Sequence, residues 1–150
     1  MSLFTAPSAL FDETTFYQTF LRDLVRCRNE VIIESPYITR ERMGTFDRIF
    51  QKLLTKNVKI YIFTRDPKEH NEFMEPQSES AIKWCEAVGI QVFLCLGNHH
   101  RKIAILDRKI VWEGSLNILS QTKSREIMRR IDDEEASAQL FDFLKYDRFL

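Results

Sequence analysis

The stretch NHHRKIAILDRKIVWEGSLN, residues 98–117, carries most of the information about the fold of this chain. Polar residues with distinct chemistry stand at fixed intervals within it: His100, Lys102, Asp107, Gly114, Ser115 and Asn117. The apolar, β-branched runs at 101–106 and 109–113 are typical of two strands joined by a short turn. The stretch therefore predicts two neighbouring strands that carry these polar groups.

The spacing of the polar groups indicates a binding pocket for an anion. Side chains alternate between the two sides of a strand, so we expect His100 and Lys102 on one face, about 6–7 Å apart. That separation suits an imidazole and an ammonium group that hold one phosphate between them. Gly114 lets the backbone approach closely, while Ser115 and Asn117 provide hydrogen-bond donors. Together these residues predict an anion pocket that contains a nucleophile.

The chain on either side of this stretch alternates between helical and strand-like patterns. The predicted elements are a helix 12–28 capped by Asp12, a strand 30–35, a helix 43–57, a strand 58–64, a helix 78–89 capped by Ser78, a strand 90–96 buried on both faces, the strands 101–106 and 109–113, a short strand 127–131, and a last helix capped by Asp132 or Asp133. Between them, 65–80 is predicted to be an irregular loop with His70 exposed to solvent. This order predicts an α/β fold, a single mixed β-sheet flanked by helices on both faces.

The composition is that of an ordinary globular protein, because 44% of the 150 residues are hydrophobic and 29% are charged. Residues 1–150 are expected to form a single domain with 1–10 as a loose N-terminal lead-in. Three cysteines show no metal-ligand spacing, so we expect neither a metal ion nor a cofactor. There is no signal-peptide pattern and no apolar run of the ~20 residues that span a bilayer, which favours a cytoplasmic protein without a membrane partner.

The spacing HxKxxxxD followed by GSxN resembles the motif of the phospholipase D superfamily, and every fixed position of that motif is present. The resemblance implies a phospholipase D-like fold and a metal-independent phosphodiesterase in which His100 forms a phosphohistidine intermediate. Lys102, Ser115 and Asn117 would then stabilise the charge on the phosphate. Members of the superfamily use two copies of the motif, and single-copy members build the site across a dimer interface. The resemblance thus implies a homodimer with two facing His100 side chains.

Two acidic residues complete the candidate catalytic set. Glu126 follows GSLN by nine residues, where members of the superfamily often carry the residue that orients the histidine ring; a plain surface role is the alternative. Asp107 belongs to the motif but points away from His100 in an ideal strand, so we expect it to fix the strand-to-turn region. His99 competes with His100 as the nucleophile, but it is followed two residues later by Arg101 instead of a lysine.

The candidate substrate-binding residues are Arg101, Gly114, Lys123, Arg125 and Tyr37. Over the whole chain 22 Lys and Arg residues balance 22 Asp and Glu residues, yet residues 98–130 contain eight basic and three acidic ones. This local excess predicts a basic patch that contacts several phosphates. Tyr37 follows Ser35 and Pro36 in the loop after a predicted strand, where open α/β sheets bind ligands; a packed loop aromatic is the alternative.

A nucleic acid, DNA or RNA, is the expected substrate, because a short chain with one motif resembles the dimeric nuclease branch of the superfamily. One alternative is a phospholipase or phosphatidyl transferase, and another is a non-catalytic module for nucleic-acid binding or dimerisation. The segment GSLN to SREIMRR also resembles single-motif domains attached to bacterial helicases and to restriction or defence systems. This implies a helicase or other ATPase as a partner, since the chain itself has no Walker A motif.

Overall fold

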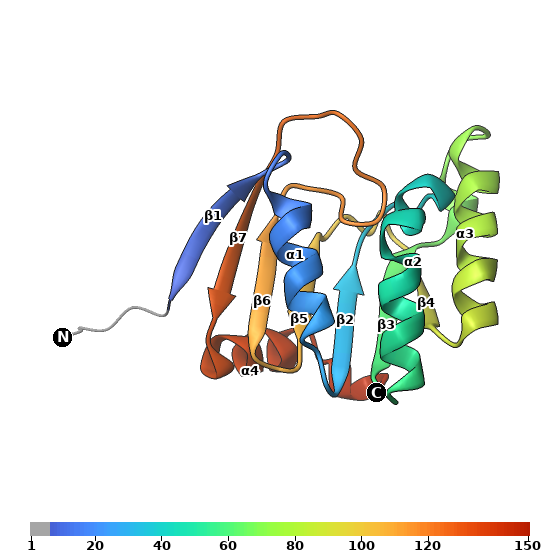
Figure 1. Cartoon of the computed structure of the whole chain (residues 1–150). Helices are drawn as coiled ribbons and strands as arrows, with labels where there is room; N and C mark the ends of the chain where they lie inside the picture. Colours follow the sequence, from blue (N-terminus) through green and yellow to red (C-terminus); the bar gives the residue numbers. More distant parts are fainter. Residues whose placement is uncertain (1–6) are drawn as a thin grey trace.

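The computed structural model describes residues 7–150 and contains one seven-stranded sheet (Figure 1). The strands are β1 (Ser8–Asp12), β2 (Glu30–Glu34), β3 (Lys59–Arg65), β4 (Gln91–Cys95), β5 (Ile103–Leu106), β6 (Ile110–Gly114) and β7 (Ile127–Asp132). The α-helices are α1 (Phe16–Val25), α2 (Arg40–Thr55), α3 (Met74–Val88) and α4 (Glu134–Phe143), and short 3-10 turns lie at Pro67–Glu69 and Tyr146–Arg148. In space the strands follow the order β1-β7-β6-β5-β2-β3-β4.

The sheet is mixed because its two halves are connected differently. β2, β3 and β4 are parallel, and α2 and α3 form the crossovers between them. The remaining strand pairs are antiparallel, and a tight turn joins β5 to β6. Three residues, 107–109, form this connection, and the N–H of Lys109 donates to the carbonyl oxygen of Leu106 at 3.0 Å. Asp107 and Arg108 both have a φ of 54°, the positive φ found at the two central residues of a type I′ turn.

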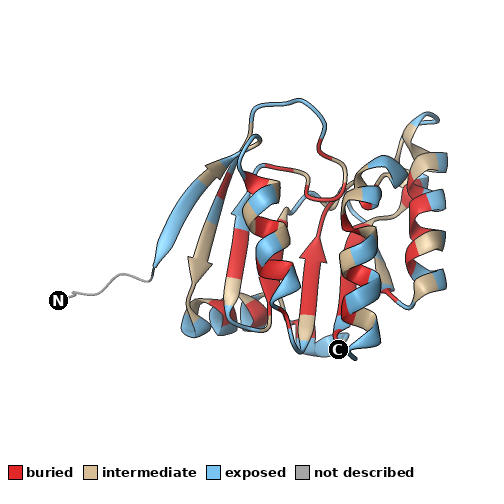
Figure 2. Cartoon of the chain, viewed as in Figure 1, coloured by how far each residue is buried: buried red, intermediate tan, exposed pale blue. Residues whose placement is uncertain are grey.

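Helices cover both faces of the sheet, as the sequence predicts. α1, α2 and α3 lie on one face, whereas α4 and the C-terminal 3-10 turn lie on the other (Figure 1). Alternate residues of β2 serve the two sides: Val31 and Ile33 belong to the larger core beneath α1–α3, and Ile32 belongs to a smaller core with Phe141 and Tyr146. Figure 2 shows β2 as buried for most of its length. The centre of the sheet is therefore packed on both faces, and the loops at its ends start from this packed core.

The N-terminal part differs from the prediction. Ser8 to Leu10, expected in a loose lead-in, belong to β1 and pair with β7, and the carbonyl oxygen of Pro7 accepts the N–H of Asp132. The rest of that lead-in, residues 1–6, lies outside the described residues. Asp12 does not cap a helix; it ends β1, and its carboxylate accepts the backbone N–H groups of Thr14 and Thr15 in the turn before α1.

Two predictions on the opposite half of the sheet were also wrong. α3 begins at Met74 and not after Ser78, because the side chain of Asn71 accepts the backbone N–H of Met74 and Pro76 is tolerated in the first turn of a helix. β4 is an edge strand and not one buried on both faces, so Leu94 is 51% exposed. No helix between residues 7 and 150 is both long and apolar enough to cross a membrane.

Candidate active site

The strand register brings the two halves of the motif to one end of the sheet. Glu34, the last residue of β2, pairs with Ile103, the first residue of β5, and Ile103 pairs with Glu113 near the end of β6. The loop that carries His100 and Lys102 and the segment Gly114–Asn117 therefore meet at the carboxyl end of β2. This is the end of an α/β sheet at which ligands bind.

His100 and Lys102 lie next to each other, although not on a strand. β5 begins only at Ile103, so both residues belong to the loop before it. The Nζ atom of Lys102 lies 2.6 Å from Nδ1 of His100 and donates a hydrogen bond to the His100 carbonyl oxygen at 2.8 Å. The His100 side chain is exposed, so its ring is open to a substrate. The two groups are thus closer than the strand spacing predicts, because the loop lets the lysine fold back.

The protonation of the site favours a nucleophile. Partial burial, together with the positive charges of Lys102 and Arg65 and the nearby His99, lowers the pKa of His100 below its usual value. The imidazole is therefore neutral at pH 7, and one ring nitrogen carries a free electron pair. Burial also lowers the pKa of Lys102, with Arg65 acting in the same direction and Glu126 opposing it.

The backbone at Gly114 and Ser115, at the end of β6, lies very close to the backbone at the start of β7. A Cβ atom on Gly114 would lie 2.1 Å from the carbonyl oxygen of Ile127, so only glycine fits there. Ser115 donates its N–H to that carbonyl oxygen at 2.9 Å, and its Oγ accepts the N–H of Ile127 at 3.0 Å. Gly114 therefore serves the close approach of backbone segments, and Ser115 fixes the position of the GSLN segment.

Asn117 and Glu126 both follow β6 in the chain, and the charge of Glu126 acts on Lys102. The Oδ1 atom of Asn117 is buried and has no hydrogen-bond partner among the described residues. Hydrogen bonds from Ser115 and Ser124, and the charge of Lys102, hold the pKa of the Glu126 carboxyl below its usual range. Glu126 is thus an anion beside Lys102. Its expected role of orienting the His100 ring stays a prediction.

Two of the predicted site residues lie elsewhere. Asp107 is at the opposite end of β5, where its carboxylate accepts the backbone N–H groups of Arg28, Asn29 and Glu30 at 2.8, 2.8 and 3.0 Å. It therefore ties the β5–β6 turn to the start of β2, as its direction in the strand suggests. Arg101 points to the α4 side of the sheet, where its Nε donates to Glu34 at 2.9 Å. It is not available beside His100, because neighbouring residues of an extended loop point to opposite sides.

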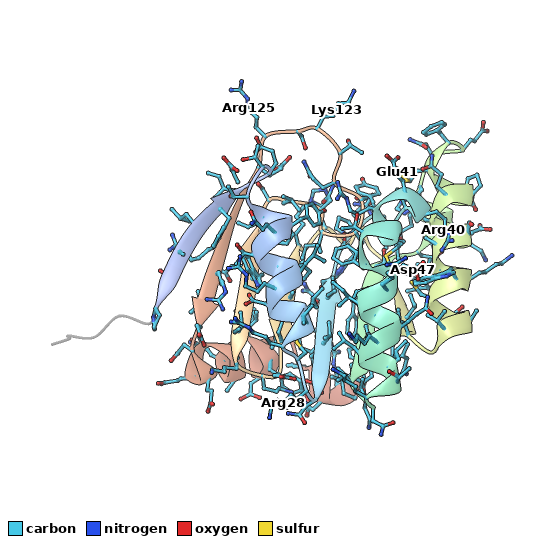
Figure 3. The ribbon with its side chains drawn as sticks, viewed as in Figure 1. Arg28, Arg40, Glu41, Asp47, Lys123 and Arg125 are labelled. Carbon is cyan, nitrogen blue, oxygen red and sulfur yellow. The ribbon has the colours of Figure 1, made fainter. Side chains whose placement is uncertain are left out.

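Lys123 and Arg125 lie on the long loop between GSLN and β7. Both are exposed, and Figure 3 shows their side chains pointing outward from the end of the molecule that holds the site. The base of this loop is fixed, since the guanidinium group of Arg42 donates two hydrogen bonds to the carbonyl oxygen of Gln121 at 3.0 and 2.7 Å. Lys123 and Arg125 are thus two exposed cations on a loop whose base is held by Arg42.

Aromatic and cationic side chains from the segments after β2 and at the end of β3 lie near His100. The Tyr37 ring lies 6.5 Å from the His100 ring and perpendicular to it, and Arg65 donates to the Tyr37 hydroxyl at 3.2 Å. His70, expected to be exposed to solvent, instead has buried ring nitrogens and packs 5.0 Å from Tyr37. Arg65 and His70 were missed as site residues. Arg65 ends β3 beside the loop of Tyr37, and that position was the available signal.

Within residues 7–150, no group of three or more His, Cys, Asp and Glu side chains is placed to hold a metal ion. His100 and Lys102 form a candidate site at the carboxyl end of β2 in an α/β fold. A family model described as "Cardiolipin synthase, PLD-like domain" matches residues 20–147, and the chain therefore belongs to the phospholipase D-like family.

Solved structures share the same fold at low sequence identity. Nuc from Salmonella typhimurium, a phospholipase D family member, superposes with a TM-score of 0.77 at 14% identity, over 94% of this chain and 93% of its own. NucT from Helicobacter pylori gives 0.70 at 20% identity, over 94% of both chains. Phosphatidylserine synthase from Haemophilus influenzae gives 0.70 at 15% identity, over 95% of this chain but 38% of its own. No curated protein sequence matched the chain.

Proposed function

We propose that this protein is a metal-independent nuclease that cleaves the phosphodiester bonds of DNA or RNA through a covalent intermediate on His100. The contact between His100 and Lys102 carries the proposal, because it places a neutral imidazole beside a cation at an exposed position. A phosphodiester is an anion that repels hydroxide, so an uncharged nucleophile next to a positive charge suits it.

The first step is attack by a ring nitrogen of His100 on phosphorus. A nitrogen–phosphorus bond forms, and the bond from phosphorus to the leaving oxygen breaks with its electron pair on that oxygen. Lys102 and the amide of Asn117 stabilise the charge on the remaining phosphate oxygens. A second acid donates a proton to the leaving oxygen. In the second step this group takes a proton from water, the water oxygen attacks phosphorus, and the bond to His100 breaks.

A homodimer supplies the second acid. The motif occurs once in the chain, and His100 is exposed, so His100 of the partner subunit can face it across a two-fold axis. An anionic phosphate between the two rings favours the protonated form of the partner's imidazole, which then serves as acid in the first step and, once it has lost this proton, as base in the second. Glu126 is proposed to orient the imidazole once the dimer is formed, because a carboxylate on one ring nitrogen fixes the tautomer.

Nucleic acid is the favoured substrate for two reasons. Lys123 and Arg125 point outward from the loop between GSLN and β7 (Figure 3), where they can contact other phosphates of the same nucleic acid. In addition, the fold match extends over nearly the full length of Nuc and NucT, whereas it covers only a part of phosphatidylserine synthase. Phosphatidyl transfer is a second candidate, supported by the name of the matched family model and by that synthase.

The decisive experiment is to trap the intermediate. The protein is mixed in EDTA with single-stranded DNA, duplex DNA or RNA that carries labelled phosphodiesters, and in parallel with labelled phosphatidylglycerol vesicles, and is then quenched with alkali. A label on His100 from an oligonucleotide, absent in His100→Ala, is the expected result. A label from lipid alone would assign the second candidate. Cleavage that survives in His100→Ala, or that requires Mg²⁺, would rule out the mechanism.

A further inference from the structure

The residues on either side of His100 are both held by one buried carboxylate. Glu34, the last residue of β2, is 0% exposed, and its Oε1 lies 2.8 Å from Nε2 of His99 and 2.9 Å from Nε of Arg101. Its Oε2 accepts a hydrogen bond from the hydroxyl of Tyr146 in the C-terminal 3-10 turn. The carboxylate of Glu34, at the end of β2, thus contacts both sequence neighbours of the proposed nucleophile.

Hydrogen bonds from other elements also hold the backbone of the loop around His100. The carboxylate of Glu69 accepts the backbone N–H groups of Gly97 at 2.9 Å and Asn98 at 3.1 Å. Arg65 donates to the carbonyl oxygen of His99 at 3.1 Å. Each of these contacts comes from an element outside the loop, so the backbone around His100 is fixed from several sides while its ring stays exposed.

The two adjacent histidines therefore differ in charge. The neighbouring Cys95 and the Glu34 carboxylate, whose Oε1 lies 2.8 Å from Nε2 of His99, raise the pKa of His99 to about 9, whereas the pKa of His100 is lowered. Burial acts to raise the pKa of Glu34, but the ion pair with His99 and the hydrogen bonds from Tyr146 and Arg101 outweigh it and bring the pKa below its usual value. At pH 7 His99 is thus a cation paired with the Glu34 anion, and His100 is neutral.

We infer that Glu34 is a positioning residue for His100. Tyr146 of the C-terminal 3-10 turn supports this role by its hydrogen bond to the Glu34 carboxylate. The carboxylate fixes His99 and Arg101 on the α4 side of the sheet, and this leaves the intervening residue directed to the substrate side. Loss of the carboxylate would leave the His99 and Arg101 cations without their buried partner, and the loop would move. The catalytic part of this inference rests on the proposed function, whereas the geometric part does not.

The test compares Glu34→Gln with a matched control, Asp23→Asn. Asp23 is also a buried carboxylate, 3% exposed, and it pairs with Arg130 at 2.7 Å and with the indole of Trp112 at 2.9 Å. It lies on the α1 side of the sheet and contacts no residue of the His100 loop. Both substitutions remove a buried ion pair, so both are expected to lower thermal stability.

Only Glu34→Gln is expected to change the site. In this variant kcat for oligonucleotide cleavage should fall about 10- to 100-fold, because small displacements of a nucleophile are costly, while KM stays within about twofold. Asp23→Asn should retain the wild-type kcat well below its melting temperature. In imidazole NMR spectra, the His100 signals should shift and the pKa of His99 should fall in Glu34→Gln alone. Tyr146→Phe, which removes one hydroxyl, should reproduce the effect in weaker form.

Equal kcat values in the two folded variants, or unchanged His100 signals in Glu34→Gln, would overturn the inference. If Glu34→Gln does not fold, His99→Gln, which leaves Glu34 paired with Arg101, is judged by the same two measurements. If the wild-type protein cleaves no nucleic acid, kcat is measured with bis(p-nitrophenyl) phosphate. If it cleaves neither, the proposed function fails, and the NMR comparison still decides whether Glu34 positions His100.

Discussion

The ammonium group of Lys102 donates to the carbonyl oxygen of His100 at 2.8 Å, and its Nζ also lies 2.6 Å from Nδ1 of the same residue. The lysine is therefore folded back over the nucleophile. A phosphate that enters the pocket offers the ammonium group a negative charge in place of the carbonyl oxygen and the imidazole. Lys102 is thus expected to move to the substrate and to release the ring nitrogen when the phosphate binds.

Replacement of Lys102 by Ala should reduce kcat about 10²–10³-fold, as is found when one donor to a developing charge is lost. Lys109→Ala is the matched control, because Lys109 is an exposed lysine at the far end of the β5–β6 hairpin. Single-turnover cleavage of a labelled oligonucleotide measures both variants. Similar rates for the two would show that Lys102 has no part in the chemistry.

The ion pair of His99 and Glu34 predicts a pH dependence of stability. Cys95 and the Glu34 carboxylate raise the pKa of His99 from 6.5 to about 9 on folding, so the folded state holds the proton more tightly than the unfolded state. This contribution is fully present below pH 6.5 and is lost as the pH rises towards 9. Urea unfolding at several pH values should show the free energy of unfolding decreasing through this window. The decrease should be smaller in His99→Gln, and an unchanged slope in that variant would contradict the assignment.

Gly114 and Gly44 should respond to the same substitution in opposite ways. Gly114→Ala places a Cβ atom against the backbone of Ile127 and should cost about 1–3 kcal/mol, as overpacking typically does. Gly44 lies inside α2 with nothing within 4 Å of the added atom, so Gly44→Ala should stabilise the protein by about 0.5–1 kcal/mol. Chemical denaturation measures both free energies. An unchanged free energy of unfolding in Gly114→Ala would mean that the backbones of β6 and β7 can separate there at little cost.

The motif and the order of elements could be predicted because both depend on local sequence. The spacing of His100 and Lys102 predicted that these two side chains lie together, and the alternation of apolar residues predicted the sheet and its two layers of helices. The strand bounds around the pocket were less accurate, since residues 100–102 are extended without pairing as a strand. Their side chains nevertheless alternate, which placed Arg101 away from His100.

Contacts between distant residues were out of reach. Glu34 meets Arg101 across 67 positions of sequence, and no local pattern indicates such a partner. The order of strands in the sheet is equally non-local, so the apolar β4 was assigned to the interior although it lies at an edge. His70 was placed in solvent because its loop is polar, whereas Tyr37, from another loop, packs against it.

Asp107 tests whether every residue of the motif is catalytic. Asp107→Ala removes the acceptor of three backbone N–H groups and should cost about 1–3 kcal/mol of stability. Because it lies at the opposite end of β5 from His100, kcat should remain close to wild type at temperatures where the variant is folded. A large loss of kcat in a fully folded Asp107→Ala would require a direct role in the site.

Lys123 and Arg125 test the nature of the substrate. Each contact with a phosphate releases counterions, so Lys123→Ala and Arg125→Ala should each weaken binding to nucleic acid and reduce the slope of log K against log salt by about 1. Arg28→Ala is the control, since Figure 3 shows Arg28 at the opposite end of the molecule. The affinity of the inactive His100→Ala background for a fluorescent oligonucleotide, measured at several salt concentrations, gives the slopes. If all three substitutions leave the slope unchanged while vesicles of anionic lipid compete for the protein, the substrate is a lipid and not a nucleic acid.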